Sequence, residues 1–257
     1  MKIIAIIPAR MAATRFPNKP MVEIKGIPMI GHCYLRSRMC ELMDEVYVAT
    51  CDQIIYDYIV SIGGKAIMTE NVHERATERT AEALLNIEAG LDLPKYDIIV
   101  MVQGDEPLIN PEMIREAAEP LLDGKRMVVN LMSELTSDAE IYNPNNVKVV
   151  FDNDRLALYM SREAIPSKQK YKNAFKTYRQ LGLIAFTRKA LLDFVSLKTT
   201  TLEIIESVDM NRFLENNIPV YMQETNYPSD AVDTLSDLKR VNAKMEKDAL
   251  FQNYKLK

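Results

Sequence analysis

Apolar runs of strand length alternate with stretches of helical spacing along most of the chain. Residues 3–7 are apolar at every position, which is typical of a parallel strand covered by helices on both faces. Residues 28–40 repeat apolar positions at helical spacing, and residues 45–50 are again strand-like. Further helices are predicted at 53–62, 71–89, 111–122, 189–197, 202–216 and from 235, and further strands at 65–68, 97–102, 126–132, 180–186 and 218–223. Alternation with connections of this length predicts an α/β fold with a doubly wound, mainly parallel sheet.

The alternation changes between residues 140 and 185. Two short strands are predicted at 147–152 and 156–160, joined by an Asn-Asp turn, so the sheet is expected to become mixed there. Residues 167–178 are polar and rich in Lys and Tyr, which indicates an exposed insertion such as a dimer arm or a lid, although their basicity could serve solubility alone. We therefore predict one domain over residues 1–257, with an inserted hairpin and dimerisation region at 140–185.

Composition and charge exclude several classes of protein. The formal charge of −4 over 257 residues, with Lys and Arg dispersed, leaves no basic stripe of the kind that nucleic acid requires. The three cysteines lack metal-ligand spacing and are an odd number, so neither a zinc site nor a disulfide framework is predicted. No apolar run reaches the length of a membrane span. We expect a cytoplasmic protein that binds neither nucleic acid nor membrane.

The first candidate for chemistry is the end of the strand at 97–102. It runs into Gly104, Asp105, Glu106 and Pro107, which places acids at its carboxyl end. Ligands of open parallel sheets collect at that edge, and carboxylates there suit a phosphate ester bound to Mg²⁺. An ordinary turn, in which Gly and Pro only make the bend, explains the same residues equally well.

The loop after the first strand is the second candidate. Residues 8–20 carry Arg10, Arg15 and Lys19 beside small side chains such as Ala9. Cations next to small residues let a loop backbone approach an anion closely, as a triphosphate requires. A solvated basic loop is the alternative.

Three later segments hold further candidates. A helix that begins near residue 71 would aim its N-terminus at the ligand edge, where Thr77 and Arg79 reach a base or phosphate. Spacing alone favours a solvated first turn for these residues. Asp233 is an acid at the entrance to the last helix, for which Thr234 is a fair N-cap. Glu203, Glu206 and Asp209 form a row of acids on one helix face, with Arg212 as their expected partner.

Taken together, these segments resemble the nucleotide-sugar cytidylyltransferases, and most closely the 3-deoxy-manno-octulosonate (Kdo) cytidylyltransferases. The Ile-Ile-Pro-Ala-Arg stretch at 6–10 and the Asn-Pro-Asn-Asn-Val-Lys-Val stretch at 143–149 are together specific for this likeness, and the Gln-Gly-Asp-Glu-Pro stretch at 103–107 also matches. All matching stretches follow one register and lie at 6–10, 14–20, 77–79 with 81–82, 102–107, 143–149, 159–166 and 232–234.

The resemblance implies a Rossmann-like fold of the nucleotide-diphospho-sugar transferase type, with a mixed, mainly parallel sheet and a small β-rich subdomain for dimerisation or as a lid. It implies a homodimer that uses CTP and Mg²⁺ to convert an acidic sugar to its CMP derivative for surface polysaccharide synthesis. The implied catalytic residues are Arg10, Lys19, Asp105 and Asp233, with Asp105 and Asp233 as metal ligands. The implied nucleotide contacts are Ala9, Arg10, Arg15, Lys19, Thr77, Arg79 and Asp105, and the sugar-side contacts are Gln103, Arg162, Gln180 and Glu206.

The chain departs from the family pattern at three places. One is the helix at 202–212, where Val208, Asp209 and Asn211 stand in place of Leu, Glu and Leu. Arg75 and Ala76 replace the usual Ser and Gly before the Thr-Glu-Arg triplet, and Gln180 and Ile184 stand where the family's sugar-facing strand has His and Tyr. A pocket without that imidazole and phenol would not bind the same hydroxyls unchanged, which leaves a different acidic acceptor open.

Two alternatives come from other classes. A nucleotide-diphospho-sugar glycosyltransferase has a similar sheet and an acidic metal motif, but it has no need of the cationic loop. A non-catalytic Rossmann-like binding module has no need of paired acids, and the chain lacks the glycine-rich signatures of dinucleotide and P-loop sites.

Overall fold

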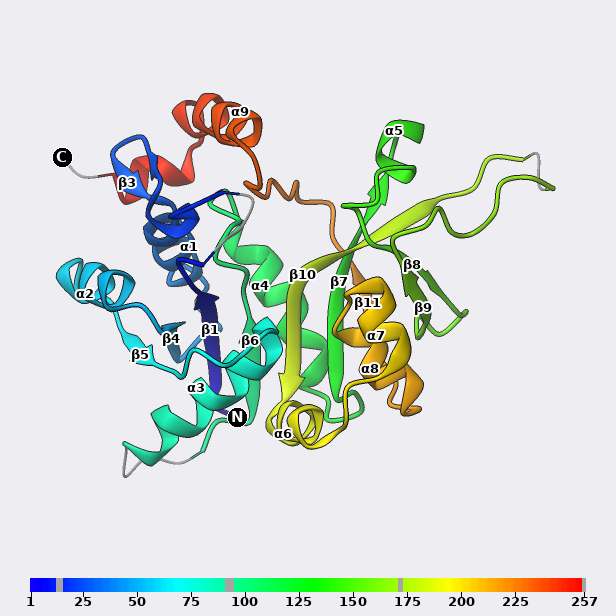
Figure 1. The fold of residues 1–257 in the computed structure, drawn as a ribbon, viewed down its shortest axis with the longest axis horizontal. Coiled ribbons are helices and arrows are strands. Elements are labelled where there is room, and N and C mark those ends of the chain that lie inside the picture. The colour runs from blue at the N-terminus through cyan, green and yellow to red at the C-terminus, as the bar shows by residue number, and fades with distance from the viewer. Residues whose placement is uncertain (13–15, 91–94, 171–172, 256–257) are drawn as a thin grey trace. The chain divides into compact units, whose positions relative to one another are not determined.

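In the computed structural model of the protein, which describes residues 1–12, 16–90, 95–170 and 173–255, the internal contacts of the chain group into two units. The first contains Met1–Arg115 and Tyr227–Lys257, and the second contains Glu116–Asn226 (Figure 1). The predicted hairpin region at 140–185 lies wholly in the second unit. Its role as an insertion into a single domain stays a prediction.

The first unit is built on the strand that the consecutive apolar residues predict. Strand β1 (Ile3–Ala9) lies between β4 (Glu45–Thr50) and β6 (Ile98–Met101), and β5 (Ala66–Met68) follows on the other side of β4. All of these pairings are parallel. All seven residues of β1 are buried, as expected for a central strand with helices on both faces.

The helices of the first unit fall close to their predicted positions with one exception. They are α1 (Met29–Ser37), α2 (Gln53–Ser61), α3 (Ala76–Ala89), α4 (Pro111–Ala118, which spans the boundary between the units) and α9 (Leu235–Glu246), with the 3-10 turns η1 (Lys19–Met21) and η3 (Leu250–Asn253). The predicted start of α3 at residue 71 is wrong. Arg75 is its N-cap, with extended backbone angles, and the Glu78 side chain accepts a hydrogen bond from the Arg75 N–H. Residues 71–75 therefore form a loop that leads into the helix.

The two ends of the chain meet in the first unit. Helix α9 packs on the hairpin of β2 (Glu23–Ile24) and β3 (Ile27–Pro28), although the sequence separates them by about two hundred residues (Figure 1). A small core between them contains Ile24, Met29, Val241 and Phe251. The Thr234 hydroxyl accepts a hydrogen bond from the N–H of Asp237, which confirms it as the N-cap of α9.

His32 of α1 is a fully buried packing residue beside the same core. Its ring nitrogens are 2.8 Å from the Tyr254 hydroxyl and from the carbonyl oxygen of Ile24. Burial lowers the pKa of His32 to about 4, so the ring is neutral at pH 7.

The second unit contains the predicted mixed sheet. Strand β7 (Val128–Leu135) pairs in parallel with β11 (Tyr221–Glu224) and antiparallel with β10 (Thr177–Thr187). Strands β8 (Lys148–Phe151) and β9 (Ala157–Ser161) form the predicted hairpin, and β8 also pairs with β10. The remaining elements are η2 (Glu119–Leu121), α5 (Asp138–Ile141), α6 (Arg188–Ser196), α7 (Thr201–Glu206) and α8 (Met210–Glu215).

The prediction of one helix over residues 202–216 is wrong. The chain breaks between α7 and α8 at Ser207, which has left-handed backbone angles (φ 52°, ψ 52°). The Arg162 guanidinium donates to the carbonyl oxygens of Glu206 (2.7 Å) and Ser207 (3.4 Å), which a continuous helix would use internally. The expected partnership of Arg212 is confirmed, because its guanidinium holds both carboxylate oxygens of buried Glu203 at 2.7 and 2.6 Å.

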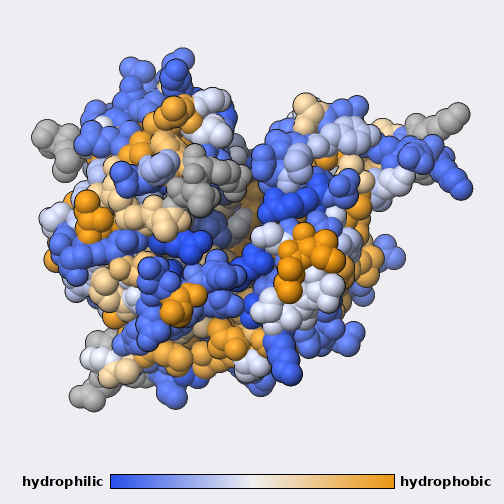
Figure 2. All heavy atoms as spheres, in the orientation of Figure 1, coloured by the Kyte–Doolittle hydropathy of each residue, from blue (hydrophilic) through white to orange (hydrophobic). Residues whose placement is uncertain are grey.

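Polar residues dominate the surface shown in Figure 2, with apolar residues in small separate groups. Over the described ranges of the chain, no helix is long and apolar enough to cross a membrane.

Candidate active site

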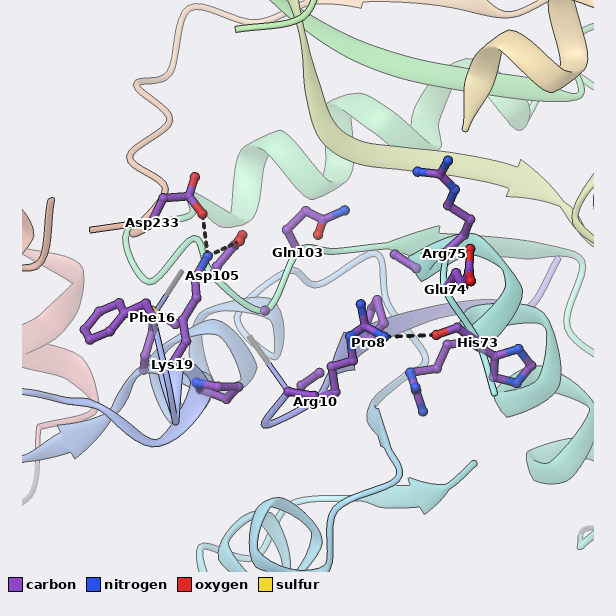
Figure 3. A pocket seen from close by; sticks show the side chains of 17 residues that line it. Pro8, Arg10, Phe16, Lys19, His73, Glu74, Arg75, Gln103, Asp105 and Asp233 are labelled. Atoms are coloured by element: carbon purple, nitrogen blue, oxygen red, sulfur yellow. Dashed lines mark hydrogen bonds and ion pairs between the residues drawn. The ribbon is translucent and has the colours of Figure 1, made fainter. Parts of the chain in front are cut away.

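A pocket of about 360 Å³ opens in the first unit, at the edge of the sheet where β1 and β6 end. Its lining comes from the loops after these strands, the start of α3 and the approach to α9 (Figure 3). The lining residues are Pro8, Ala9, Arg10, Ala12, Phe16, Lys19, Pro20, Met29, His73, Glu74, Arg75, Ala76, Arg79, Gln103, Gly104, Asp105 and Asp233. Adjacent parallel strands end at the same edge, which explains why these distant segments meet there.

Gly104 lets the loop after β6 lie directly against the end of β1. A Cβ atom on this residue would lie 3.0 Å from the carbonyl oxygen of Pro8 and 3.2 Å from the Ile30 side chain. Only glycine allows this approach without movement of the backbone. It places the following residue, Asp105, beside the cationic loop.

Three charged side chains form the centre of the pocket. The Lys19 ammonium is 2.7 Å from Asp105 Oδ2 and 2.8 Å from Asp233 Oδ1 (Figure 3). Burial by itself lowers the pKa of Lys19, but the two carboxylates more than offset that effect and the net pKa is raised. Lys19 is therefore a cation at neutral pH, and it brings Asp105 and Asp233 together from separate parts of the chain.

Hydrogen bonds between the two segments that carry Asp105 and Asp233 hold these segments together. The N–H of Val232 donates to the carbonyl oxygen of Asp105 at 3.0 Å. The Ser229 hydroxyl is 2.9 Å from both carboxylate oxygens of Glu106. The segments that carry Asp105 and Asp233 thus lie side by side and are joined at two points.

The other side of the pocket is cationic. Arg10 donates to the carbonyl oxygen of His73 at 3.2 Å. Arg79 is only 3% exposed and donates from Nη1 to the Thr69 hydroxyl and to the carbonyl oxygen of Glu70, so a solvated turn is the wrong interpretation for this residue. Its Nη2 is buried and has no acceptor among the described residues. An unsatisfied buried donor costs about 1–3 kcal/mol, which an anionic ligand in this pocket would relieve.

The predicted first-unit residues divide into three groups. Ala9, Gln103 and the charged residues above line the pocket. Thr77 is fully buried and is not one of the lining residues, with its hydroxyl 3.8 Å from the Met101 sulfur, and its predicted role near the nucleotide stays a prediction. Arg15 lies outside the described residues.

The remaining predicted sugar-side residues belong to the second unit. Glu206 accepts hydrogen bonds from the Tyr159 and Ser161 hydroxyls and from the Arg162 N–H at 2.7–2.8 Å. The guanidinium of Arg162 also donates to the Pro144 carbonyl oxygen at 2.9 Å. Both side chains thus have structural contacts within their own unit. The Oε1 of Gln180 is buried without a partner in the described part of the chain. A sugar-side role for these residues stays a prediction.

Sequence reasoning missed several lining residues, among them Phe16, His73 and Arg75. The His73 ring contacts Glu82, which also accepts the N–H of Glu70, and the loop formed in this way presents the His73 carbonyl to Arg10. The charged residues before α3 were a signal in the sequence that this segment could bind a ligand. Helical spacing alone instead assigned them to a solvated first turn of the helix.

The donor set at the centre of the pocket fits Mg²⁺. The described residues contain no cluster of three or more His, Cys, Asp or Glu side chains placed to hold a metal. Mg²⁺ takes oxygen ligands, uses one or two carboxylates and completes its shell with water and phosphate oxygens. Asp105 and Asp233 would supply these carboxylates if the ion binds here, and their shared contact with the Lys19 ammonium shows that both can reach one cation.

Comparison with known proteins gives consistent results. A family model described as cytidylyltransferase matches residues 4–226. The 3-deoxy-manno-octulosonate cytidylyltransferase of Flavobacterium johnsoniae is 41% identical over 95% of this chain and 98% of its own. The enzyme of the same name from Geobacter metallireducens is 42% identical over 96% of this chain and 99% of its own.

Solved structures of nucleotidyltransferases also resemble this chain. A CMP:2-keto-3-deoxy-manno-octonic acid synthetase complexed with CTP has a TM-score of 0.87 and 33% identity, over 96% of this chain and 99% of its own. A putative glucose-1-phosphate thymidylyltransferase from Bacillus anthracis has a TM-score of 0.66 at 18% identity, over 99% of this chain and 97% of its own, and supports the fold alone. These likenesses confirm the predicted Rossmann-like nucleotidyltransferase fold.

A lysine substitution tests whether the paired carboxylates accept a divalent cation. In Lys19→Met, Asp105 and Asp233 face each other without their shared ammonium, and we expect the protein to lose about 1 kcal/mol of stability. Millimolar Mg²⁺ should raise the melting temperature of this variant more than that of the unmodified protein. Lys244→Met is the control, because Lys244 pairs with Asp230 outside this pocket. Equal responses of both variants to Mg²⁺ would contradict the cation site.

Proposed function

The chain belongs to the cytidylyltransferase family, and we propose that it transfers CMP from CTP to 3-deoxy-manno-octulosonate or a close analogue, with release of pyrophosphate. The relatives that bear the matching name support this acceptor, and the related structure that contains CTP supports the donor. The observation that carries the proposal is the pocket in which Asp105 and Asp233 share Lys19, opposite Arg10 and Arg79.

In the proposed reaction a sugar hydroxyl attacks the α-phosphorus of CTP. A new phosphorus–oxygen bond forms, the bond from the α-phosphorus to the oxygen bridging to the β-phosphate breaks so that pyrophosphate leaves, and the proton of the hydroxyl passes to solvent water. Most of the acceleration would come from holding the reactants in line and from neutralising charge on the phosphates. Arg10 and Lys19 supply that charge at the pocket, and the unpartnered Nη2 of Arg79 is a donor available to a phosphate oxygen. Arg15 remains a proposed further contact.

Asp105 and Asp233 are the proposed ligands of Mg²⁺. Bound there with the triphosphate, the ion would offset charge on the α-phosphate and the departing pyrophosphate. The two carboxylates and the Lys19 ammonium sum to one negative charge, which favours a divalent cation over a bare anion at this point of the pocket.

A different acidic acceptor is a second candidate, and Gln180 favours it. Gln180 and Ile184 stand where the family pattern has His and Tyr, and the buried amide oxygen of Gln180 has no partner in the described residues. A buried amide in place of the imidazole, together with the loss of the phenol, would bind a different arrangement of hydroxyls on the acceptor.

Family membership also supports the predicted homodimer in the cytoplasm. Residues 140–185 are the proposed contact, since Tyr142 and Leu158 in this range are each 64% exposed. Measurement of the mass in solution tests the dimer, and a monomer at micromolar concentration would refute it.

A pyrophosphate-release assay tests the proposed function. We expect release from CTP and Mg²⁺ only when an acidic sugar is present, with the CMP conjugate detected by mass. A panel of 3-deoxy-manno-octulosonate and related acids identifies the acceptor. Activity with another acid but not with 3-deoxy-manno-octulosonate would support the second candidate. Absence of a CMP conjugate with every acid would refute the cytidylyl transfer.

Substitution of one aspartate tests the proposed metal ligands. Asp105→Asn keeps the size of the side chain but removes its charge, and we expect turnover to fall at least about a hundredfold while the fold persists. Glu112→Gln is the control, because Glu112 is a half-exposed acid of the same unit that pairs with nearby Arg115 and does not line the pocket. Activity of Asp105→Asn close to that of the control would eliminate the metal role.

A further inference from the structure

Arg36 lies behind the candidate active site and contacts the elements that lead from both aspartates. We infer that it is a positioning residue, which fixes the spacing of Asp105 and Asp233 and so sets the affinity of the site for its divalent cation. The inference rests on the proposed function, and Arg36 itself does not line the pocket.

The Arg36 side chain is a fully satisfied buried cation. It extends from α1, is 1% exposed, and has an acceptor for each of its five N–H groups. Nε donates to the Tyr254 hydroxyl at 2.9 Å, and Nη1 donates to the carbonyl oxygens of Leu108 (3.3 Å) and Ile109 (3.4 Å). Nη2 contacts the Asp248 carboxylate and, at 3.5 Å, the Met245 sulfur.

The contacts of Nη1 reach Asp105 through a short, stiff segment. Leu108 follows Asp105 by three residues, with Pro107 between them, and the N–H of Ile109 donates to the carbonyl oxygen of Glu106 at 3.1 Å. Proline fixes one backbone angle, and the turn closes the segment on itself. Movement of the Leu108 and Ile109 carbonyls would therefore move Asp105.

The contacts of Nη2 reach Asp233 through a helix. Asp248 lies just beyond the C-terminal end of α9, and Asp233 lies just before the capped N-terminus of the same helix. The Asp248 carboxylate also accepts the N–H of Phe251 at 2.8 Å, which holds it in place. Because a helix of twelve residues is stiff, anchoring one end restrains the other.

This arrangement has a physical reason. Two carboxylates that share one cation repel each other, and in the described part of the chain Lys19 holds them together from the pocket side. A divalent cation needs its oxygen ligands at a narrow range of distances. The planar guanidinium of arginine contacts several acceptors in fixed directions, which the ammonium of a lysine cannot reproduce.

The test compares Arg36→Lys with Arg212→Lys. Arg212 is a similarly buried arginine that pairs with Glu203 within the second unit. Both variants should lose stability. We expect Arg36→Lys to raise the Mg²⁺ concentration for half-maximal turnover about tenfold, as loss of contacts that orient a metal ligand commonly does. Arg212→Lys should leave that concentration unchanged. The KM of Arg212→Lys for CTP, measured at saturating Mg²⁺, should also remain unchanged.

Tyr254→Phe provides a milder variant, since it removes the acceptor of one Arg36 N–H group and leaves the ring in place. We expect a smaller shift in the same direction. The same Mg²⁺ dependence in Arg36→Lys, Tyr254→Phe and Arg212→Lys would overturn the inference, even if all three melt at lower temperature. Failure of the unmodified protein to use CTP would instead refute the proposed function. In that case the Mg²⁺-dependent rise in melting temperature, compared across the same variants, still decides the role of Arg36.

Discussion

The charge balance between Lys19 and the carboxylates of Asp105 and Asp233 is the constraint on which the pocket depends. Two like charges stay close only when a cation lies between them and the surrounding backbone is fixed. The structure meets both conditions. The ammonium contacts both carboxylates, and the hydrogen bond from Val232 to the Asp105 carbonyl joins the segments that carry them. The close approach at Gly104 and the apolar docking of α9 on the β2–β3 hairpin help to fix that backbone.

The sequence alone predicts the parts of this arrangement that depend on local patterns. The buried run of β1, the acid after β6 and the cap at Thr234 each have a short-range signal. The contacts of Lys19 do not, because they span 86 and 214 residues. The sequence does not predict the break at Ser207 either, because this break also depends on a contact between distant residues. The carbonyl oxygens of Glu206 and Ser207 accept hydrogen bonds from Arg162 rather than from N–H groups of a continuous helix.

The nucleotide side and the acceptor side of the chain differ in how far they follow the family. The residues around Arg10 and Asp105 keep the family motifs and meet at one pocket. On the acceptor side, Glu206 is engaged with Tyr159 and Ser161, while Gln180 replaces a histidine. The nucleotide side therefore supports the transfer of CMP, and the identity of the acid depends on positions such as Gln180, whose buried amide oxygen has no partner among the described residues.

The central claim is that Asp105 and Asp233 together hold one divalent cation beside the nucleotide. Crystals grown with Mn²⁺ and a non-hydrolysable CTP analogue test it directly, because Mn²⁺ takes the same oxygen ligands as Mg²⁺ and is located by its anomalous scattering. The account predicts a peak within about 2.0–2.4 Å of an oxygen from each aspartate. A peak bound to the phosphates alone, with Asp105 and Asp233 still paired only with Lys19, would contradict it.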